Sequence, residues 1–184
     1  YRAAAELDPA NAQYAIATAE MMMETGDLAG AREFLESRGP TFRHHAGVRQ
    51  TLGHTALLQG DRARAAEMFN EARLLAPDDT QIAEDLARVL IDLGDFAQAD
   101  IHLSRLLREA AEAPATENTR ITRADGRPVK REPAPTRRDL LALRALCLAK
   151  LDRPVEARDL LLQLTRPPEG DNDVNAWIAL GEVS

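Results

Sequence analysis

The sequence predicts an all-α fold, an α-α superhelix in which antiparallel helix pairs stack as a solenoid. A Gly-Asp pair recurs at Gly26, Gly60 and Gly94, in steps of 34 residues, and an alanine follows each glycine five residues later. A period of this size is typical of supersecondary units that stack on their neighbours. The composition agrees: 45% of the residues are hydrophobic but only 4% are aromatic, which favours closely packed helices over a β-sandwich.

Glycine and proline predict where the helices end. Each glycine of a Gly-Asp pair can end one helix in the left-handed conformation, and the aspartate after it can cap the next. With the apolar periodicity, these signals predict four helix pairs at residues 12–25 with 28–37, 45–59 with 62–75, 79–93 with 96–111, and 138–151 with 154–164. Such short helices are not stable alone in water, so their neighbours must stabilise them.

The period divides the chain into repeats and one insertion. We expect the tail of an upstream repeat at 1–9, repeats at 12–45, 46–79 and 80–112, an insertion at 113–137, a fourth repeat at 138–173, and the start of a fifth at 174–184. The insertion is inferred because Ala157 follows Ala99 by 58 residues and the prolines between them exclude a continuous helix. The partial repeats at both ends predict a piece of a longer array. Two lysines against 21 arginines indicate a bacterial source.

Within the period, the residues resemble the tetratricopeptide-repeat family. That family has a 34-residue helix-turn-helix with Trp-x2-Leu-Gly-x2-Tyr, then Ala-x3-Phe, then Pro. The matching residues here are Leu52-Gly53, Ala65-x3-Phe69 and Pro77 in the second repeat, and Trp177-x2-Leu180-Gly181 near the end of the chain. The other repeats are looser: alanine replaces the first-helix glycine, and Arg144 stands where an apolar residue is usual.

The motif predicts how the helices pack. Small residues should let helix axes approach closely, at Ala19, Ala31, Gly53, Ala65, Ala87, Ala99 and Ala145. Larger residues should fill the space between adjacent pairs, at Leu35, Phe69, Leu103 and Leu161.

The resemblance implies that the first helix of each pair lines a groove that receives a peptide or partner protein. The candidate groove residues are Gln13, Ile16, Glu20, Met23, Gln50, His54, Leu57, Gln81, Glu84, Arg88, Ile91 and Leu146. Their mixture of amides, charges and aliphatic groups suits an extended segment, although a solvated helix face is the alternative. One branch of the family clamps acidic tails with inward Lys, Asn and Arg. Here Ile16, Glu20, Thr51, Gln81 and Asp85 hold those places, so we do not expect that activity.

Other functional classes find little support. The formal charge of -7 argues against nucleic-acid binding, and no run approaches 18 apolar residues, so we expect no direct membrane insertion. The four histidines have no Cys or carboxylate at ligand spacing, and no phosphate loop is present. Cys147 is expected to be a buried, inert thiol, and the Met21–Met23 run to be one core methionine between two partly exposed ones. We therefore predict no catalytic residue, metal or cofactor.

The insertion has a charge of its own. It is basic, at +3 from Glu112 to Arg138, and its candidate contact residues are Arg120, Arg123, Arg127, Lys130 and Arg131. It is either a short hairpin around Asp125-Gly126 or a mobile loop. In either form it is predicted to contact an acidic partner or the acidic surface of the array itself.

The sequence as a whole predicts a non-enzymatic scaffold for protein–protein contact. The alternatives are a regulatory or substrate-docking arm of a larger enzyme, or a structural part of an envelope export assembly. Self-association through the terminal repeats is a further possibility. The sequence does not decide between a cytoplasmic and a periplasmic location.

Overall fold

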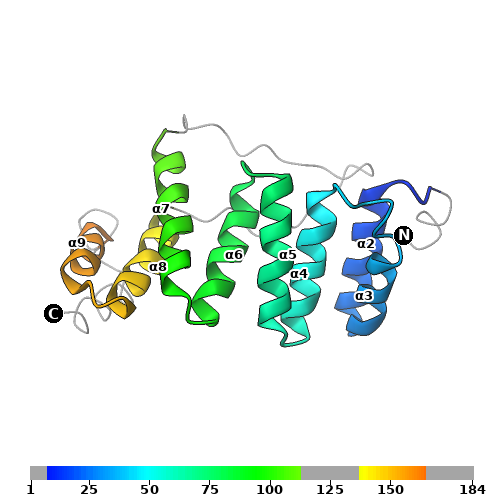
Figure 1. Cartoon of the computed structure of the whole chain (residues 1–184), viewed down its shortest axis with the longest axis horizontal. Helices are drawn as coiled ribbons and strands as arrows, with labels where there is room; N and C mark the ends of the chain where they lie inside the picture. Colours follow the sequence, from blue (N-terminus) through cyan, green and yellow to red (C-terminus); the bar gives the residue numbers. More distant parts are fainter. Residues whose placement is uncertain (1–7, 113–136, 165–184) are drawn as a thin grey trace. The chain divides into compact units, whose positions relative to one another are not determined.

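The computed structural model describes residues 8–112 and 137–164, and all of its regular structure there is α-helical (Figure 1). The helices are α2 (Ala12–Glu24), α3 (Leu28–Glu36), α4 (Ala46–Leu58), α5 (Arg62–Leu75), α6 (Thr80–Asp92), α7 (Phe96–Glu112), α8 (Arg137–Lys150) and α9 (Pro154–Leu164). Each end lies within one residue of the helix end predicted from the sequence, which confirms the helix pairs in the described ranges.

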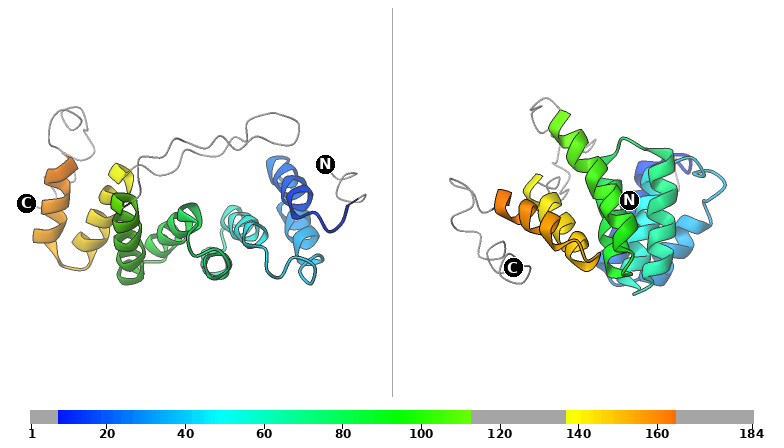
Figure 2. Two further views of the ribbon diagram at one scale, coloured as in Figure 1. Left: turned by 90° about the horizontal axis from the view of Figure 1, so that it is seen from above. Right: turned by 60° about the vertical axis from the view of Figure 1, so that its left-hand side comes forward.

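The chain divides into two units, Tyr1–Asp95 and Phe96–Ser184. In the first unit, α2 packs against α3 and α4, α4 packs against α5, and α5 packs against α6. Viewed from above in Figure 2, α2, α4 and α6 form one layer, and α3 and α5 form the other. In the second unit, α7 packs against α8 and α8 against α9. The predicted pairs α2–α3, α4–α5 and α8–α9 are therefore confirmed.

Left-handed backbone residues end the first helix of each pair. Gly26, Gly60 and Gly94 have φ angles of 84°, 80° and 79°, and Asp152 takes the same role in the last pair with a φ angle of 58°. Asp27 and Asp61 cap the next helices as predicted. Asp27, for example, accepts a hydrogen bond at 3.0 Å from the backbone N–H of Gly30.

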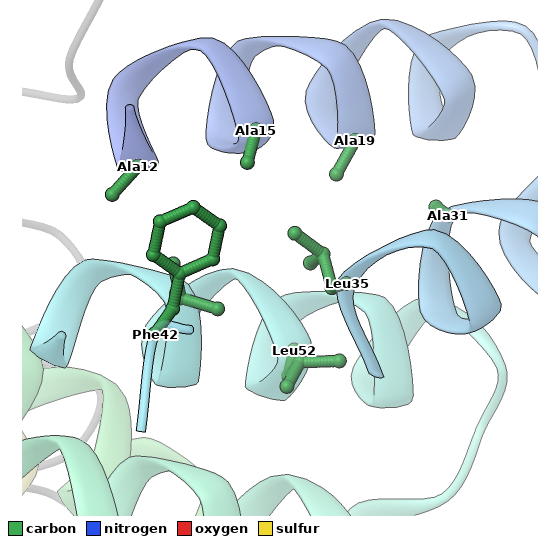
Figure 3. Close-up of a cluster of buried hydrophobic side chains, with 8 residues drawn as sticks. Ala12, Ala15, Ala19, Ala31, Leu35, Phe42 and Leu52 are labelled. Atoms are coloured by element: carbon green, nitrogen blue, oxygen red, sulfur yellow. The ribbon is translucent and has the colours of Figure 1, made fainter. Parts of the chain in front are cut away.

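The core of the first unit is built from alanines facing larger side chains. Figure 3 shows Ala12, Ala15 and Ala19 of α2 pointing toward Phe42, which precedes α4, and toward Leu35 and Leu52. The alanines predicted at close helix contacts are all buried, at 2% exposure or less, and so are the predicted space-filling residues Leu35, Phe69, Leu103 and Leu161, at 3% or less. These packing predictions are confirmed.

Gly53 shows why a small residue is needed at one of these contacts. A Cβ atom placed there would lie 2.6 Å from Cε1 of Phe69, which is fully buried. Two carbon atoms cannot approach that closely, so only glycine fits without displacing the ring.

The prediction for the methionine run was wrong. Met21 is 48% exposed, whereas Met22 and Met23 are both partly buried against the core of the first unit. Met22 and Met23 follow the buried Ala19 by three and four residues, which places them on the same helix face, whereas Met21 turns away. Helical spacing therefore gives two packed methionines and one exposed methionine.

Several predicted features lie outside the described residues. They are the upstream tail at 1–7, nearly all of the insertion, with the candidate contacts Arg120, Arg123, Arg127, Lys130 and Arg131, and the start of a further repeat at 174–184.

Candidate binding face

The first-helix layer of the first unit carries most of the candidate groove residues, and we call this surface of α2, α4 and α6 the first-helix face. Its members differ in exposure. Those that are exposed are Gln13, Glu20 and Arg88; those that are half-buried are Ile16, Met23, Gln50, His54, Leu57, Gln81 and Ile91. Glu84 is buried, and Leu146 is exposed on α8 of the second unit.

Polar side chains from α4 and α6 meet at Asp85. Its Oδ2 atom accepts a hydrogen bond from Nε2 of Gln50 at 2.8 Å and lies 3.2 Å from Nε2 of His54. The His54 ring packs edge-on against Phe69, with ring centroids 5.0 Å apart. Because Phe69 is held by the close contact at Gly53, the residues that pack α4 against α5 also orient the polar group.

Glu84 and Arg88 form a second polar contact on α6. The Arg88 guanidinium donates to Oε1 of Glu84 through Nε at 2.9 Å and through Nη2 at 2.6 Å. The Glu84 side chain is only 5% exposed, whereas that of Arg88 is 54% exposed. A partner at this point would meet the guanidinium first, so Arg88 is the better contact candidate of the two.

The aliphatic candidates of α2 contribute to helix packing. Ile16 and Met23 pack against the core of the first unit. Gly47 of α4 leaves room for Ile16, because a Cβ atom there would lie 3.1 Å from Cδ1 of Ile16. Met23 also touches α4, since its sulfur lies 3.2 Å from the Thr55 hydroxyl. These two residues therefore present only part of their surface.

Asp85 was not among the candidate groove residues, although it lies at the centre of this polar cluster. A signal was available: Asp85 follows Gln50 by 35 residues, one period plus one, and successive periods place such residues on neighbouring first helices. Its role was missed because periodicity indicates which residues share a layer but not which side chains touch.

The second unit contains an ion cluster that explains the unusual Arg144. Its Nε atom lies 2.8 Å from Oδ1 of Asp100, and Nη1 of Arg153 lies 3.5 Å from the other oxygen of the same carboxylate. Arg153 is also bound at 2.6 Å by Glu156, and the hydrogen bond from that carboxylate raises the pKa of the Arg153 guanidinium. Asp100 thus gives the charged Arg144 a partner at a place that is usually apolar.

Cys147 is buried on α8, as predicted. Burial raises the pKa of its thiol to about 11, and the negative charge of Asp100 contributes in the same direction. A thiol with so high a pKa is almost entirely protonated at neutral pH and is a poor nucleophile.

The described residues contain neither a metal-binding cluster nor a membrane-spanning helix. In residues 8–112 and 137–164, no three His, Cys, Asp or Glu side chains lie close enough to hold a metal ion. In the same ranges, no helix combines the length and apolar character needed to span a bilayer.

Two family models, both described as tetratricopeptide repeat, match residues 56–116 and 12–37. The first spans α5, α6 and α7, and the second spans the α2–α3 pair. These two stretches of the chain are tetratricopeptide repeats. The solved structures to which it is similar are proteins of the same repeat type.

Three of these structures match almost the whole length of this chain. The chain is similar to YrrB, described as a tetratricopeptide-repeat protein with an unusual peptide-binding site, with a TM-score of 0.73 and 18% identity over 99% of this chain and 80% of that one. It is similar to MamA from Desulfovibrio magneticus (TM-score 0.71, 12% identity, 96% and 84% covered). It is also similar to PilF of Pseudomonas aeruginosa (0.65, 11%, 93% and 66%). At these identities the likeness shows the fold alone.

One relative is similar in sequence. The chain is 32% identical over 101 residues to the cellulose synthase 1 operon protein C of Komagataeibacter xylinus. The match covers 54% of this chain but only 8% of that relative, which is far longer.

Proposed function

We propose that this tetratricopeptide-repeat chain is a non-enzymatic scaffold that binds a peptide or an extended segment of a partner protein along its first-helix face. The observation that carries the proposal is the meeting of α4 and α6 at Asp85, where Gln50 and His54 present polar groups at the surface of a rigid helical layer. Polar groups held on packed helices lose little conformational freedom when a ligand binds, which favours recognition.

The absence of catalysis is part of this proposal. The most reactive type of side chain in the described residues is the Cys147 thiol, and its burial and raised pKa oppose nucleophilic chemistry. His54 and Asp85 are paired, but none of their described contacts is a Ser, Thr or Cys that they could activate. The face is therefore equipped to hold a ligand but not to transform it.

The test starts from a displayed random peptide library selected on the full 184-residue chain. The strongest peptides are synthesised, and their binding is measured by fluorescence anisotropy. The first variant carries Gln50→Ala, His54→Ala and Arg88→Ala on the first-helix face. The matched control carries Arg64→Ala, Glu67→Ala and Asn70→Ala on α5, in the other layer of the same unit.

We expect the first-helix variant to lose most of the binding and the α5 control to keep it, with both variants retaining their helical circular dichroism. Equal binding to the wild type and to both variants would contradict the proposal. A third variant lacking residues 115–135 tests the predicted contacts of the basic insertion. Unchanged affinity for every peptide would show that the insertion does not contribute.

A second candidate function is a structural role in an envelope export assembly. It is favoured by the sequence similarity to a protein named for a cellulose synthase operon. The test is deletion of the repeat region from the gene in its host, followed by measurement of secreted polysaccharide. A normal amount of polysaccharide would exclude this role.

A further inference from the structure

The Asp85 carboxylate uses only one of its two oxygens within the protein. Oδ2 faces both Gln50 and His54, whereas Oδ1 has no partner among the described residues. The side chain is only 11% exposed, but Oδ1 is not among the buried unpaired atoms of the described residues, so it remains open to solvent. A carboxylate oxygen in this position can accept a hydrogen bond from a ligand.

Among residues 8–95, no arginine forms an ion pair with Asp85. Three arginines of the first unit are paired with other carboxylates: Arg88 with Glu84, Arg49 with Glu71 and Arg62 with Asp92. A carboxylate shielded from water interacts more strongly with a cation than an exposed one does. Among charged donors, Lys and Arg form the shortest and strongest hydrogen bonds to carboxylates.

The charge of the surrounding unit favours the same ligand. Residues 8–95 hold fifteen Asp and Glu against eight Arg and no Lys, a formal charge of -7 with histidines neutral. Such a field attracts a basic segment and repels an acidic one.

Taken together, the geometry points to a specific partner chemistry: we propose that Oδ1 of Asp85, framed by Gln50 and His54, receives a lysine or arginine side chain of a peptide lying on the first-helix face. This inference rests on the proposed function and adds the identity of one anchor residue in the partner. The site is organised before binding, because the contact with Phe69 orients the His54 ring and the bond from Gln50 orients the carboxylate.

The experiment uses the peptides selected on the wild-type chain, in three comparisons. The first asks whether one peptide position is enriched in Lys and Arg. The second compares Asp85→Asn, which keeps the side-chain shape, with Asp92→Asn, an exposed aspartate on the same helix whose replacement changes the net charge equally. The third replaces the basic peptide residue by norleucine and measures binding to the wild-type chain, so it needs no protein variant to fold.

We expect a fixed basic position, and a rise in Kd of about tenfold or more for Asp85→Asn and for the norleucine peptide. The two changes together should weaken binding little more than either alone, because both remove the same contact. Asp92→Asn should change Kd by less than about twofold, since it removes a solvent-screened charge whose ion pair with Arg62 is itself exposed.

Different results would overturn the Asp85 anchor and the scaffold function. Peptides that depend on the first-helix face but show no basic position, or that respond equally to Asp85→Asn and Asp92→Asn, would overturn the Asp85 anchor and leave the scaffold function standing. Failure to select any peptide, or peptides indifferent to the Gln50, His54 and Arg88 variant, would overturn both.

Discussion

At residue 53, a single hydrogen atom in place of a methyl group decides whether α4 and α5, the two helices of one repeat, can pack. The Phe69 ring occupies the space that a Cβ atom would need, and it is fully buried between His54 and the core. An interior of this density transmits small volume changes, because side chains have little room to move aside.

We predict that Gly53→Ala destabilises the chain by about 1–3 kcal/mol through overpacking. Phe69→Leu creates the missing space, so the double variant Gly53→Ala, Phe69→Leu should lose less stability than the two single changes summed. Urea unfolding followed by circular dichroism measures all four proteins. Additive losses would mean that the two residues do not compete for the same volume.

A substitution at Gly60 tests backbone strain without any change in packing. Its φ angle is 80°, yet a Cβ atom there would meet nothing within 4 Å. We therefore predict a loss of about 1 kcal/mol for Gly60→Ala and a smaller loss for Gly60→Asn, because asparagine tolerates the left-handed conformation. Conversely, Asp152→Gly should raise stability, since Asp152 holds a φ angle of 58° with a side chain. Thermal melts give this order, and equal melts for the wild type and the two residue-60 variants would contradict it.

At the scale of elements, the helices of the second unit are joined by a shared carboxylate as well as by apolar packing. Asp100 on α7 binds Arg144 on α8 and also Arg153, which immediately precedes α9. The Asp100 and Arg144 side chains are 13% and 26% exposed, so water screens this pair less than it screens a surface pair.

We predict a coupling energy of about 1–2 kcal/mol between Asp100 and Arg144 in a double-mutant cycle of alanine substitutions. The comparison pair is Arg64 and Glu36, each 41% exposed, for which the coupling should stay below about 0.5 kcal/mol. Urea unfolding supplies both cycles. Equal coupling energies for the two pairs would show that burial adds nothing to the Asp100 contact.

For the whole molecule, stability is a sum of contacts between neighbouring helices. Within each unit, a helix packs against those next to it along the array, and the described helices other than α7 are too short to be stable alone. A side chain that is buried where helices associate becomes exposed when they separate. Cys147 is buried in this way and can therefore be used to follow unfolding.

The pKa of Cys147 rises from 9.0 to about 11 on folding, so the folded chain holds the proton more tightly than the unfolded chain. Its contribution to stability is complete below pH 9 and is lost as the pH rises from about 9 to 11. We predict that the wild type loses more stability over this window than Cys147→Ala does, as measured by urea unfolding at several pH values. Parallel pH profiles would refute the raised pKa.

Much of the fold could be predicted because its signals are local. Gly26, Gly60 and Gly94 end helices through their own backbone freedom, and Asp27 caps a helix through a bond to a residue three positions away. The candidate site was predicted less completely. The layer that holds Gln50 and His54 follows from the period, but Asp85 was missed because its contacts depend on the rotamers of side chains 31 and 35 residues away.

The sequence by itself determined the helices, their pairing, the tetratricopeptide-repeat family and the buried small residues, because each of these depends on spacing along one chain. Only the tertiary structure decided which polar groups of different helices meet: Arg144 with Asp100, and one oxygen of Asp85 with Gln50 and His54. The physical reason is that a charged side chain is available to a ligand only after the protein's own donors and acceptors have been paired, and that pairing is made in three dimensions.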